Sequence, residues 1–560
     1  MNLFSKIIIL LSLALALALS GCGSSVAGGT VQPPSVIFST YLGGHTSCLL
    51  GEEPLTFAQD CACDSQGDVY VTGTTQVSDL PVKNAFQPAP APNSAKSAFV
   101  AKYGPTGELL WCTYLGGRQE SGGVAIAALP DGGAAVTGIT TSDNFPTFHP
   151  CQEHLNGLSD YFVAAFDAQG RLTYSTYLGG SGTEGEADAL FADDSNNGNH
   201  LAADDNGLVY LTGETDSAGG EEEIKYPVTE NALQKDLAGD TDAVVSVINP
   251  QVQGRDSLLY SSFLGGADNE KGHAVAVEGA GGHFAVAGYT KSRNFPTTPN
   301  GYRSAPAPQG FISNAFVVRF GVESPGVLDS AYQMSYSTYL GANSSEARDE
   351  TYSITLDNRG RIIATGRTQS PDYPMRGAYL PSIYNRAPYL EPETSGDQPY
   401  LVKIDPELSG TQSLVYSSFL GGGQASGEGG GFGTGVAVDG RGAAYVAGEI
   451  NSPGIPYKYS PTPQEAPQLF PYTWNAFFPA LQGQYDVFLM KIGPTGSVLE
   501  YSTFWGGQES DRSYGLAIDP WGNTAVSGLT FSRDFPLQNP AQTWPGNAGH
   551  QNAFISKFKL

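Results

Sequence analysis

A six-residue motif recurs seven times along the chain, and this internal repeat constrains the fold more than any other feature. The motif has the form aromatic–Ser/Cys–Ser/Thr–aromatic–Leu/Trp–Gly and starts at Phe38, Trp111, Tyr174, Tyr260, Tyr336, Tyr416 and Tyr501. Six intervals separate residue 38 from residue 501, so one repeat averages about 77 residues. Such a period indicates an array of small units that pack against one another.

Three further segments recur in step with this motif. The first segment precedes a turn and ends near Asp and Gly, as in Val436–Asp439. The second segment follows that turn and ends in Gly, as in Val69–Gly73. The third segment has the form of Ala98–Lys102. Each is short, apolar or alternating, and bounded by Gly, Asp, Asn or Pro, as expected of strands joined by turns. Four strands in each of seven units predict an all-β, seven-bladed β-propeller with four antiparallel strands per blade. A linear β-solenoid is the alternative, but its repeats are shorter and it needs caps at both ends.

The order of the strands predicts how the ring closes. The chain starts with a strand of the outer type at residues 36–42 and ends with a strand of the Ala98–Lys102 type at residues 553–558. The last blade therefore lacks an outer strand, and the N-terminal strand is the spare one. We expect these two segments to pair.

Taken together, the segments YSTYLGG, AVD, YVTG, the Asp/Asn-Phe-Pro turn and AFVAK resemble the SBBP family of β-propeller repeats of bacterial surface proteins, over about residues 36–560. The resemblance implies a fold and a location in the bacterial cell envelope more than an activity. We interpret the recurrent Asp/Asn-Phe-Pro turns, such as 144–146 and 294–296, as structural.

The N-terminus predicts a lipoprotein. Lys6 precedes an apolar run from Ile7 to Leu19, which is too short to span a bilayer and has the length of a signal-peptide core. The run ends in Leu-Ser-Gly-Cys22, which resembles a bacterial lipobox and implies lipidation of Cys22. We therefore divide the chain into a signal peptide (1–21), a lipidated Cys with a flexible tether (22–35) and the propeller (36–560). Gly23 after the Cys favours the outer membrane or cell surface.

The amino-acid composition excludes some classes of binding partner. A formal net charge of −27 argues against nucleic acid, because phosphate binding needs basic patches. It also argues against adhesion to bare anionic lipid and favours a soluble monomer. Five cysteines besides Cys22 are an odd number for an oxidising compartment, and the sequence leaves their pairing open: Cys48, Cys61, Cys63, Cys112 and Cys151. Cys61 and Cys63 are two apart on one strand and should share a face rather than pair.

Loops on one face of the ring hold the candidate binding residues. The loops after the second strand are long at about 214–241, 369–397 and 449–484, and the last is rich in Tyr and Pro. Exposed aromatic side chains on a rigid scaffold suit sugar rings or Pro-rich peptides. The candidate ligand-binding residues are Tyr457, Tyr459, Tyr472 and Trp474. The alternative is that this loop folds over its own blade.

Acidic residues also follow each outer strand. They are Glu52 or Glu53, Glu120, Glu184, Glu270, Glu346, Glu428 and Glu509. A ring of single carboxylates does not supply the six to eight oxygens that Ca²⁺ prefers, so we expect each Glu to bind within its own blade. The acidic segment with Asp193, Asp194, Asp204 and Asp205 is a better Ca²⁺ candidate, although a solvated loop is the favoured interpretation. We predict no cofactor and no metal site.

Signals of catalysis are sparse. No GxSxG, HExxH or P-loop motif occurs, and none of the seven His recurs in the repeat. His149, Cys151 and His154 have the residue types of a zinc site, but Cys151 aligns with Phe86 and fits a packing role. We predict a non-catalytic binding or interaction scaffold for a glycan, a peptide or an envelope protein. A polysaccharide-active enzyme with carboxylates at the channel mouth and a purely structural surface protein are the alternatives.

Overall fold

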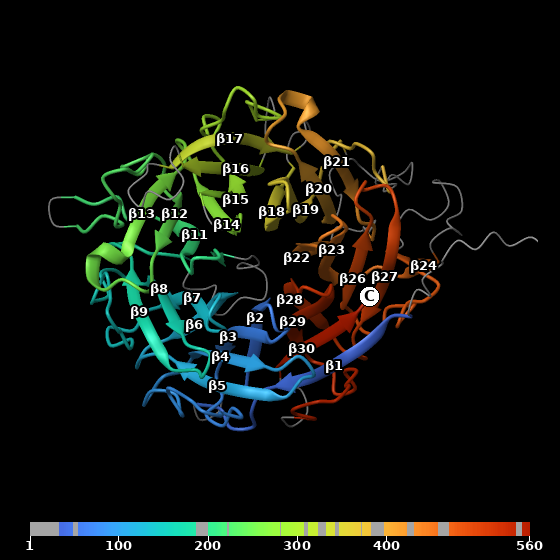
Figure 1. Ribbon diagram of the computed structural model, residues 1–560, viewed down its shortest axis with the longest axis horizontal. Helices are drawn as coiled ribbons and strands as arrows, with labels where there is room; N and C mark the ends of the chain where they lie inside the picture. Colours follow the sequence, from blue (N-terminus) through green and yellow to red (C-terminus); the bar gives the residue numbers. More distant parts are fainter. Residues whose placement is uncertain are drawn as a thin grey trace, which may run out of the picture. The chain divides into compact units, whose positions relative to one another are not determined.

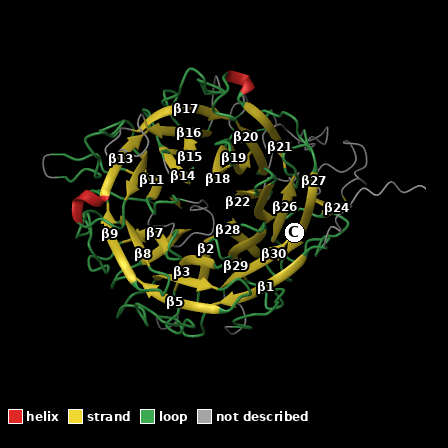
Figure 2. Cartoon of the chain, in the orientation of Figure 1, coloured by secondary structure: helices red, strands yellow, loops and turns green. Residues whose placement is uncertain are grey.

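Seven four-stranded antiparallel sheets follow one another around a ring in the computed structural model (Figure 1). The structure describes residues 33–48, 54–185, 200–220, 223–279, 282–306, 312–322, 332–341, 347–370, 372–381, 397–422, 430–456, 470–544 and 551–560. Helix is confined, in this part of the chain, to two short 3₁₀ turns, η2 (Gly254–Ser257) and η3 (Gly410–Gln412), as Figure 2 shows. The predicted fold class and strand number per blade are confirmed.

The first four blades follow the chain from its second strand. Blade 1 has β2 (Thr56–Cys63), β3 (Val69–Thr75), β4 (Ser97–Tyr103) and β5 (Leu109–Leu115). Blade 2 has β6 (Ser121–Ala128), β7 (Ala134–Thr140), β8 (Asp160–Phe166) and β9 (Leu172–Leu178). Blade 3 has β10 (Leu201–Ala203), β11 (Val209–Thr215), β12 (Asp242–Ile248) and β13 (Leu258–Leu264). Blade 4 has β14 (Glu270–Val277), β15 (His283–Thr290), β16 (Asn314–Val322) and β17 (Tyr332–Leu340).

The last three blades complete the ring. Blade 5 has β18 (Asp349–Leu356), β19 (Ile362–Thr368), β20 (Gln398–Ile404) and β21 (Leu414–Phe419). Blade 6 has β22 (Gly431–Val438), β23 (Ala444–Ile450), β26 (Asp486–Ile492) and β27 (Leu499–Trp505), beside a short parallel pair, β24 (Gly454–Pro456) and β25 (Phe470–Tyr472). Blade 7 has β28 (Asp511–Ile518), β29 (Asn523–Thr530), β30 (Asn552–Lys559) and β1 (Ser35–Leu42).

The N-terminal strand closes the ring as the strand order predicts. β1 pairs antiparallel with β30, with Ser39 opposite Ser556 and Leu42 opposite Ala553. The outer strand of blade 7 is therefore supplied from the other end of the propeller sequence. The segment Ser35–Leu560 forms one compact unit.

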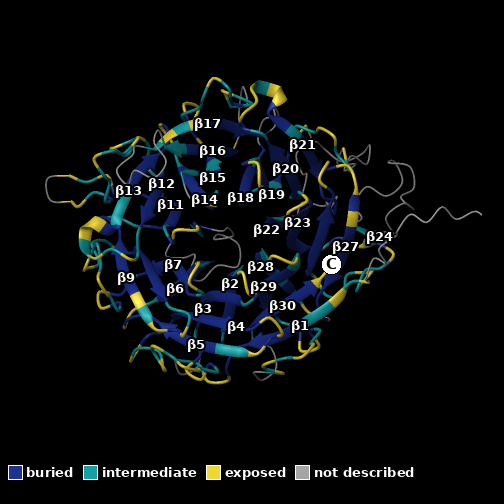
Figure 3. Ribbon diagram, in the orientation of Figure 1, coloured by how far each residue is buried: buried dark blue, intermediate teal, exposed yellow. Residues whose placement is uncertain are grey.

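Most strand residues are buried on both sides, because each sheet packs between two neighbouring sheets (Figure 3). β3, β4, β7 and β8 are buried along their whole length. This burial explains why these strands are apolar or small in composition rather than strictly alternating. The Gly two residues before the end of the second strand has a steric role, since a Cβ added at Gly73 would collide with the carbonyl oxygen of Phe57 on β2.

An ion pair explains two recurrent motifs, the Asp after the inner strand and the Lys that ends the third. In blade 7, Lys557 Nζ lies 3.0 Å from Asp519 Oδ2, and both side chains are almost completely buried. Lys557 Nζ also donates a 2.6 Å hydrogen bond to the carbonyl oxygen of Gly67 in blade 1. The pair therefore fastens the last blade to the first. Lys102 and Asp64 form the corresponding pair in blade 1, at 3.6 Å.

The Asp/Asn-Phe-Pro turn packs within its own blade, as interpreted from the sequence. In blade 2, Phe145 is buried and its backbone N–H donates to Tyr177 Oη at 2.8 Å. Tyr177 Oη in turn donates to the carbonyl oxygen of Ser142 at 2.7 Å. The outer-strand Tyr thus holds the turn, and Tyr339 holds the turn of blade 4 in the same way.

The loops divide between the two faces of the ring. Among the described residues, the loops after the second strands, such as 76–96, and the connections into the inner strands, such as 116–120, lie on one face, which we call the mouth face. The tight turns, such as 64–68 and 167–171, lie on the opposite face, which we call the turn face. No helix in the described part of the chain is long and apolar enough to cross a membrane.

Candidate functional site

A cavity of about 400 Å³ opens between blades 4 and 5 at the mouth face, and we call it the mouth pocket. It is lined by Lys271, His273, Tyr289, Lys291, Ile312, Ser313, Arg348, Glu350, Tyr352 and Arg367. These residues come from the first residues of β14 and β18, the last residues of β15 and β19, and the adjoining loops. Ionisable and aromatic side chains therefore make up most of the wall.

β-Bulges turn two of these side chains toward the pocket. The pairing of β14 with β15 shifts between Gly272 and Ala274, and the intervening residue is His273. The pairing of β18 with β19 shifts between Thr351 and Ser353, and the intervening residue is Tyr352. A bulge re-aims a side chain relative to the regular pleat. Other blades have a bulge at the same register but a different residue there, such as Val124 in blade 2.

Ion pairs cross the pocket and its margin. Lys271 Nζ lies 2.9 Å from Glu214 Oε1 of blade 3, and both side chains are mostly buried. Arg367 lies 2.8 Å from Glu350 Oε2 and 3.3 Å from Asp397 Oδ2. These pairs hold the guanidinium of Arg367 and the ammonium of Lys271 in fixed positions.

His273 lies at the base of the pocket and is neutral. Its Nδ1 is 2.9 Å from the carbonyl oxygen of Thr351. Burial lowers the pKa of His273 to about 3, and the charge of Lys271 contributes in the same direction. Because a carbonyl oxygen only accepts, Nδ1 carries the proton and Nε2 keeps its lone pair. The rings of Tyr289 and Tyr352 flank it, with centroids 5.4 and 5.2 Å from that of His273.

Two cations at the rim remain accessible. The side chain of Arg348 is 40 % exposed and lies 3.8 Å from Glu350, beyond hydrogen-bonding distance. Lys291 is exposed in the loop that follows β15. Together with the half-buried ring of Tyr289, they can contact an anionic group and a flat ring at the same time. This local excess of positive charge stands out in a chain whose net charge is −27.

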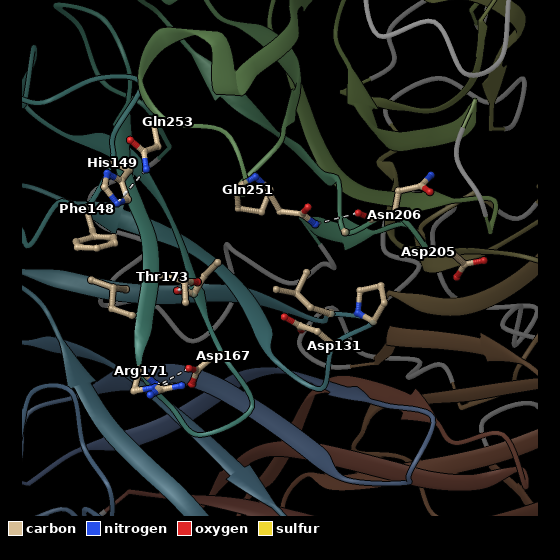
Figure 4. A pocket seen from close by; sticks show the side chains of 16 residues that line it. Asp131, Phe148, His149, Asp167, Arg171, Thr173, Asp205, Asn206, Gln251 and Gln253 are labelled. Carbon is tan, nitrogen blue, oxygen red and sulfur yellow. Dashed lines mark hydrogen bonds and ion pairs between the residues drawn. The ribbon is translucent and has the colours of Figure 1, made fainter.

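A second, larger cavity of about 800 Å³ lies between blades 2 and 3 at the turn face, and we call it the interblade groove. Figure 4 shows its lining, with Phe148, His149 and Gln253 at one end and Asp205 and Asn206 at the other. Carboxylates and carboxamides predominate among the labelled side chains. The groove lies on the face opposite the loops from which we predicted binding.

The predicted aromatic site is only partly within the described residues. Tyr457 and Tyr459 lie outside them, as does Cys22. Tyr472 ends β25 and is half-buried, whereas Trp474 follows it and is 95 % exposed. Neither residue lines the mouth pocket or the interblade groove.

The recurrent acids follow the outer strands but lie at different register positions in their blades. Glu270 begins β14, is buried, and accepts hydrogen bonds from Thr290 Oγ1 and the Gly266 N–H. Glu184 binds Thr215 and Ser217 in the same manner. Glu120 precedes the equivalent residue, Ser121, and Glu509 precedes Asp511, so both lie in turns. Glu52, Glu53, Glu346 and Glu428 lie outside the described residues.

The remaining polar candidates have structural partners. Asp204 Oδ1 accepts from the N–H groups of Asn206 and Leu208 and so caps the β10–β11 turn, while Asp193 and Asp194 lie outside the described residues. Within the described ranges, no three His, Cys, Asp or Glu side chains are grouped as a metal site would need. Cys151 lies near Thr176, and the five described cysteines are all unbridged. Cys61 and Cys63 pack against the same hydrophobic cluster, on one face of β2 as expected, whereas Ala62 packs against another.

The mouth pocket was not predicted from the sequence, although one position of the repeat carries a signal for it. The residue after the Gly of each second strand occupies one register position and varies widely. In chain order it is Thr74, Ile139, Glu214, Tyr289, Arg367, Glu449 and Leu529. Charged or phenolic side chains occupy this position in blades 3 to 6 and mark the polar part of the mouth.

Comparison with known proteins gives one family and several distant relatives. Residues 37–81 match the model of the SBBP beta-propeller repeat. The regulatory protein FlaEY of Caulobacter vibrioides is 24 % identical over 271 residues, which is 47 % of this chain. The chain spans only about a quarter of the length of that relative, because the match covers 24 % of it.

Solved structures resemble the chain only distantly. The polysaccharide lyase Uly1 has a TM-score of 0.38 at 7 % identity, with 94 % of this chain and 98 % of that chain covered. A PL25 ulvan lyase has a TM-score of 0.38 at 10 % identity, with 88 % and 92 % covered. A luciferin-regenerating enzyme has a TM-score of 0.28 at 9 % identity, with 74 % and 87 % covered. The repeat match and the seven four-stranded sheets agree with each other: this chain is a seven-bladed β-propeller with a match to the SBBP repeat at residues 37–81.

Proposed function

We propose that this protein is a binding scaffold of the cell envelope that holds acidic saccharides in the mouth pocket. The observation that supports it is that Arg348 and Lys291, two accessible cations, line the same cavity as Tyr289. A guanidinium or ammonium binds a carboxylate or sulfate, and an aromatic face suits a pyranose ring. The cavity volume of about 400 Å³ fits one or two sugar units.

The chemistry of the pocket favours binding over catalysis. A general base works best when its pKa lies near the working pH. Burial lowers the pKa of His273 to about 3 and raises the pKa of Tyr352 far above its ordinary value, so neither side chain exchanges protons readily near neutral pH. Glu350 accepts hydrogen bonds from Arg367 and Tyr352. The pocket is thus set up to present fixed charges and rings.

Calorimetric titration of the full-length chain with tetragalacturonate tests the proposal. The matched ligand is the methyl-esterified tetramer, which has the same shape without the charge. We expect the acidic tetramer to bind and the ester to bind at least about tenfold more weakly, since a charge-assisted hydrogen bond contributes about 1.5–3 kcal/mol. Arg348→Ala should weaken the acidic tetramer by a similar factor, and Arg533→Ala, an exposed cation in the β29–β30 loop, should not. Equal affinity for acid and ester would refute the proposal.

The same proposal includes anchoring through Cys22. Two or more acyl chains hold a protein stably at a membrane, because each buried CH₂ contributes about 0.8 kcal/mol. Wild-type protein expressed in a lipoprotein-processing bacterium should partition into the detergent phase of Triton X-114. Cys22→Ser should move it to the aqueous phase, and Cys48→Ser should leave it unchanged. Detergent partitioning of the Cys22→Ser variant would contradict the lipid anchor.

A further inference from the structure

We infer that the interblade groove at the turn face is a second binding site, specific for neutral saccharides. It is independent of the mouth pocket because it lies between different blades and at the other face of the ring. Its lining combines segments from both blades: the β6–β7, β8–β9 and β10–β11 turns, the β12–β13 connection, and residues 148–149 from the loop after β7.

A departure from the repeat forms one end of the groove. In blades 1 and 7, the outer loop has an Asn in the left-handed region, Asn84 with φ 49° and Asn539 with φ 43°. The amides of these residues donate to the backbone of their own outer strands, at 3.3 and 3.0 Å. In blade 2 the corresponding residue is His149, also left-handed with φ 55°. A short Asn side chain supports this conformation by hydrogen-bonding locally, which the amides of Asn84 and Asn539 do, so the fold alone does not favour His here.

The side chain of His149 contacts the neighbouring blade. Its Nε2 lies 3.4 Å from Gln253 Nε2, in the connection between β12 and β13, as Figure 4 shows. Phe148, next to it, is 44 % exposed, and the two rings are in contact with centroids 4.1 Å apart. A strained position that directs an imidazole away from its own strand, beside an accessible aromatic face, is characteristic of ligand sites.

A long connection forms the opposite wall. Nine residues connect β12 and β13, as they do β20 and β21 in blade 5, whereas five connect β8 and β9. The longer connection places Gln251 and Gln253 along the groove, and Gln251 Nε2 donates to the carbonyl oxygen of Asn206 at 3.2 Å. The long β12–β13 connection therefore adds carboxamide side chains to the groove. The shorter β8–β9 turn contributes only Asp167 and Arg171, next to the first residues of β9.

The charge of the groove selects the class of saccharide. Asp131, Asp167 and Asp205 contribute three carboxylates, and the single cation, Arg171, lies 2.7 Å from Asp167. Anionic sugars are therefore repelled. Carboxylate and carboxamide groups match the hydroxyls of a neutral sugar, which donate and accept hydrogen bonds, and the exposed ring of Phe148 suits its C–H face. With an acidic ligand at the mouth face, a propeller of this kind bridges two chemically different glycans.

The test is saturation-transfer NMR on the full-length chain with neutral hexasaccharides of glucose, mannose, galactose and xylose. We expect at least one to bind with a Kd below about 5 mM, a weak interaction typical of a small open site. Phe148→Ala should weaken that binding about tenfold. His149→Asn should weaken it too while the melting temperature stays the same or rises, because Asn suits the left-handed conformation.

The controls separate this site from the mouth pocket. Arg348→Ala should leave neutral binding unchanged, and tetragalacturonate should bind Phe148→Ala as it binds wild type. If a neutral hexasaccharide binds and tetragalacturonate does not, the result supports the groove and refutes only the mouth-pocket proposal. If none of the four hexasaccharides binds, or if Phe148→Ala and His149→Asn bind as tightly as wild type, the inference is wrong.

Discussion

Replacing Lys557 by Met should loosen the contact that joins blade 7 to blade 1. Lys557 Nζ binds Asp519 Oδ2 at 3.0 Å and the carbonyl oxygen of Gly67 at 2.6 Å. The Lys and Asp side chains are each only 1 % exposed, so water does not replace the lost ammonium. Met retains much of the side-chain volume, and the substitution therefore tests the charge rather than the packing.

The structure sets the expected cost. Removing one partner of a buried ion pair costs about 3–5 kcal/mol. Asp519 keeps hydrogen bonds from the Asn523 side chain at 2.7 Å and from the Trp521 and Asn523 N–H groups at 3.0 and 2.9 Å, which favours the lower value of about 3 kcal/mol. The unpaired carbonyl of Gly67 adds about 1 kcal/mol. We therefore expect a loss of about 4 kcal/mol in the free energy of unfolding.

Calorimetry converts this loss into a melting temperature. An unfolding entropy of about 2.1 cal/mol/K per residue gives about 1.1 kcal/mol/K for the whole of Ser35–Leu560, if the ring unfolds as one unit. Lys557→Met should then lower the Tm by about 4 °C. Lys559→Met, two residues along the same strand and exposed, should change it by less than about 1 °C. The double variant Asp519→Asn/Lys557→Met should recover most of the loss. A Tm for Lys557→Met within experimental error of wild type would refute the structural role of the pair.

Three further perturbations test the fold. Tyr177→Phe removes the hydroxyl between the Phe145 N–H and the Ser142 carbonyl, so calorimetry should show a loss of about 1–3 kcal/mol; no change would contradict the role of the outer-strand Tyr. Burial raises the pKa of Asp60 to about 7, so the contribution of Asp60 to the free energy of unfolding should fall by about 4 kcal/mol between pH 4 and pH 7. Asp60→Asn should therefore have a flatter Tm profile over this range than wild type, whereas parallel profiles would count against this role. Deleting residues 35–42 exposes the edge of β30 and should give oligomers in light scattering; a monomer with the wild-type Tm would argue against closure by β1.

The propeller could be predicted from the sequence because its repeat is tied to burial. Each strand is packed on both sides, so aromatic, small and Gly positions recur wherever neighbouring sheets approach. The Gly of each second strand is an example, since a Cβ at Gly73 has no room beside β2. Ring closure followed from counting strand types, and the pairing of β1 with β30 confirms it.

The mouth pocket could not be predicted in the same way because its parts meet only across blades. Glu214 and Lys271 lie on different sheets, and their contact depends on the register between an inner strand and the blade before it. Register also separates the recurrent acids. Glu120 lies one residue before the position that Glu270 occupies in its own blade, and a shift of one residue moves a side chain to the other face of a strand.

Both candidate sites use repeat positions that the fold leaves free. The position after the second-strand Gly accepts Ile139 in blade 2 and Arg367 in blade 5, and the bulge accepts Val124 or His273, while the strand pairing stays the same. The left-handed loop position, by contrast, suits Asn in two blades, and blade 2 departs from it at His149. The strand pairing around these positions does not require these side chains. Selection for packing alone therefore does not account for the cluster of charged and aromatic side chains between blades 4 and 5. The blades of the ring are otherwise equivalent, so the side chains at these variable positions distinguish one gap between blades from the next. We therefore expect these positions to determine ligand specificity.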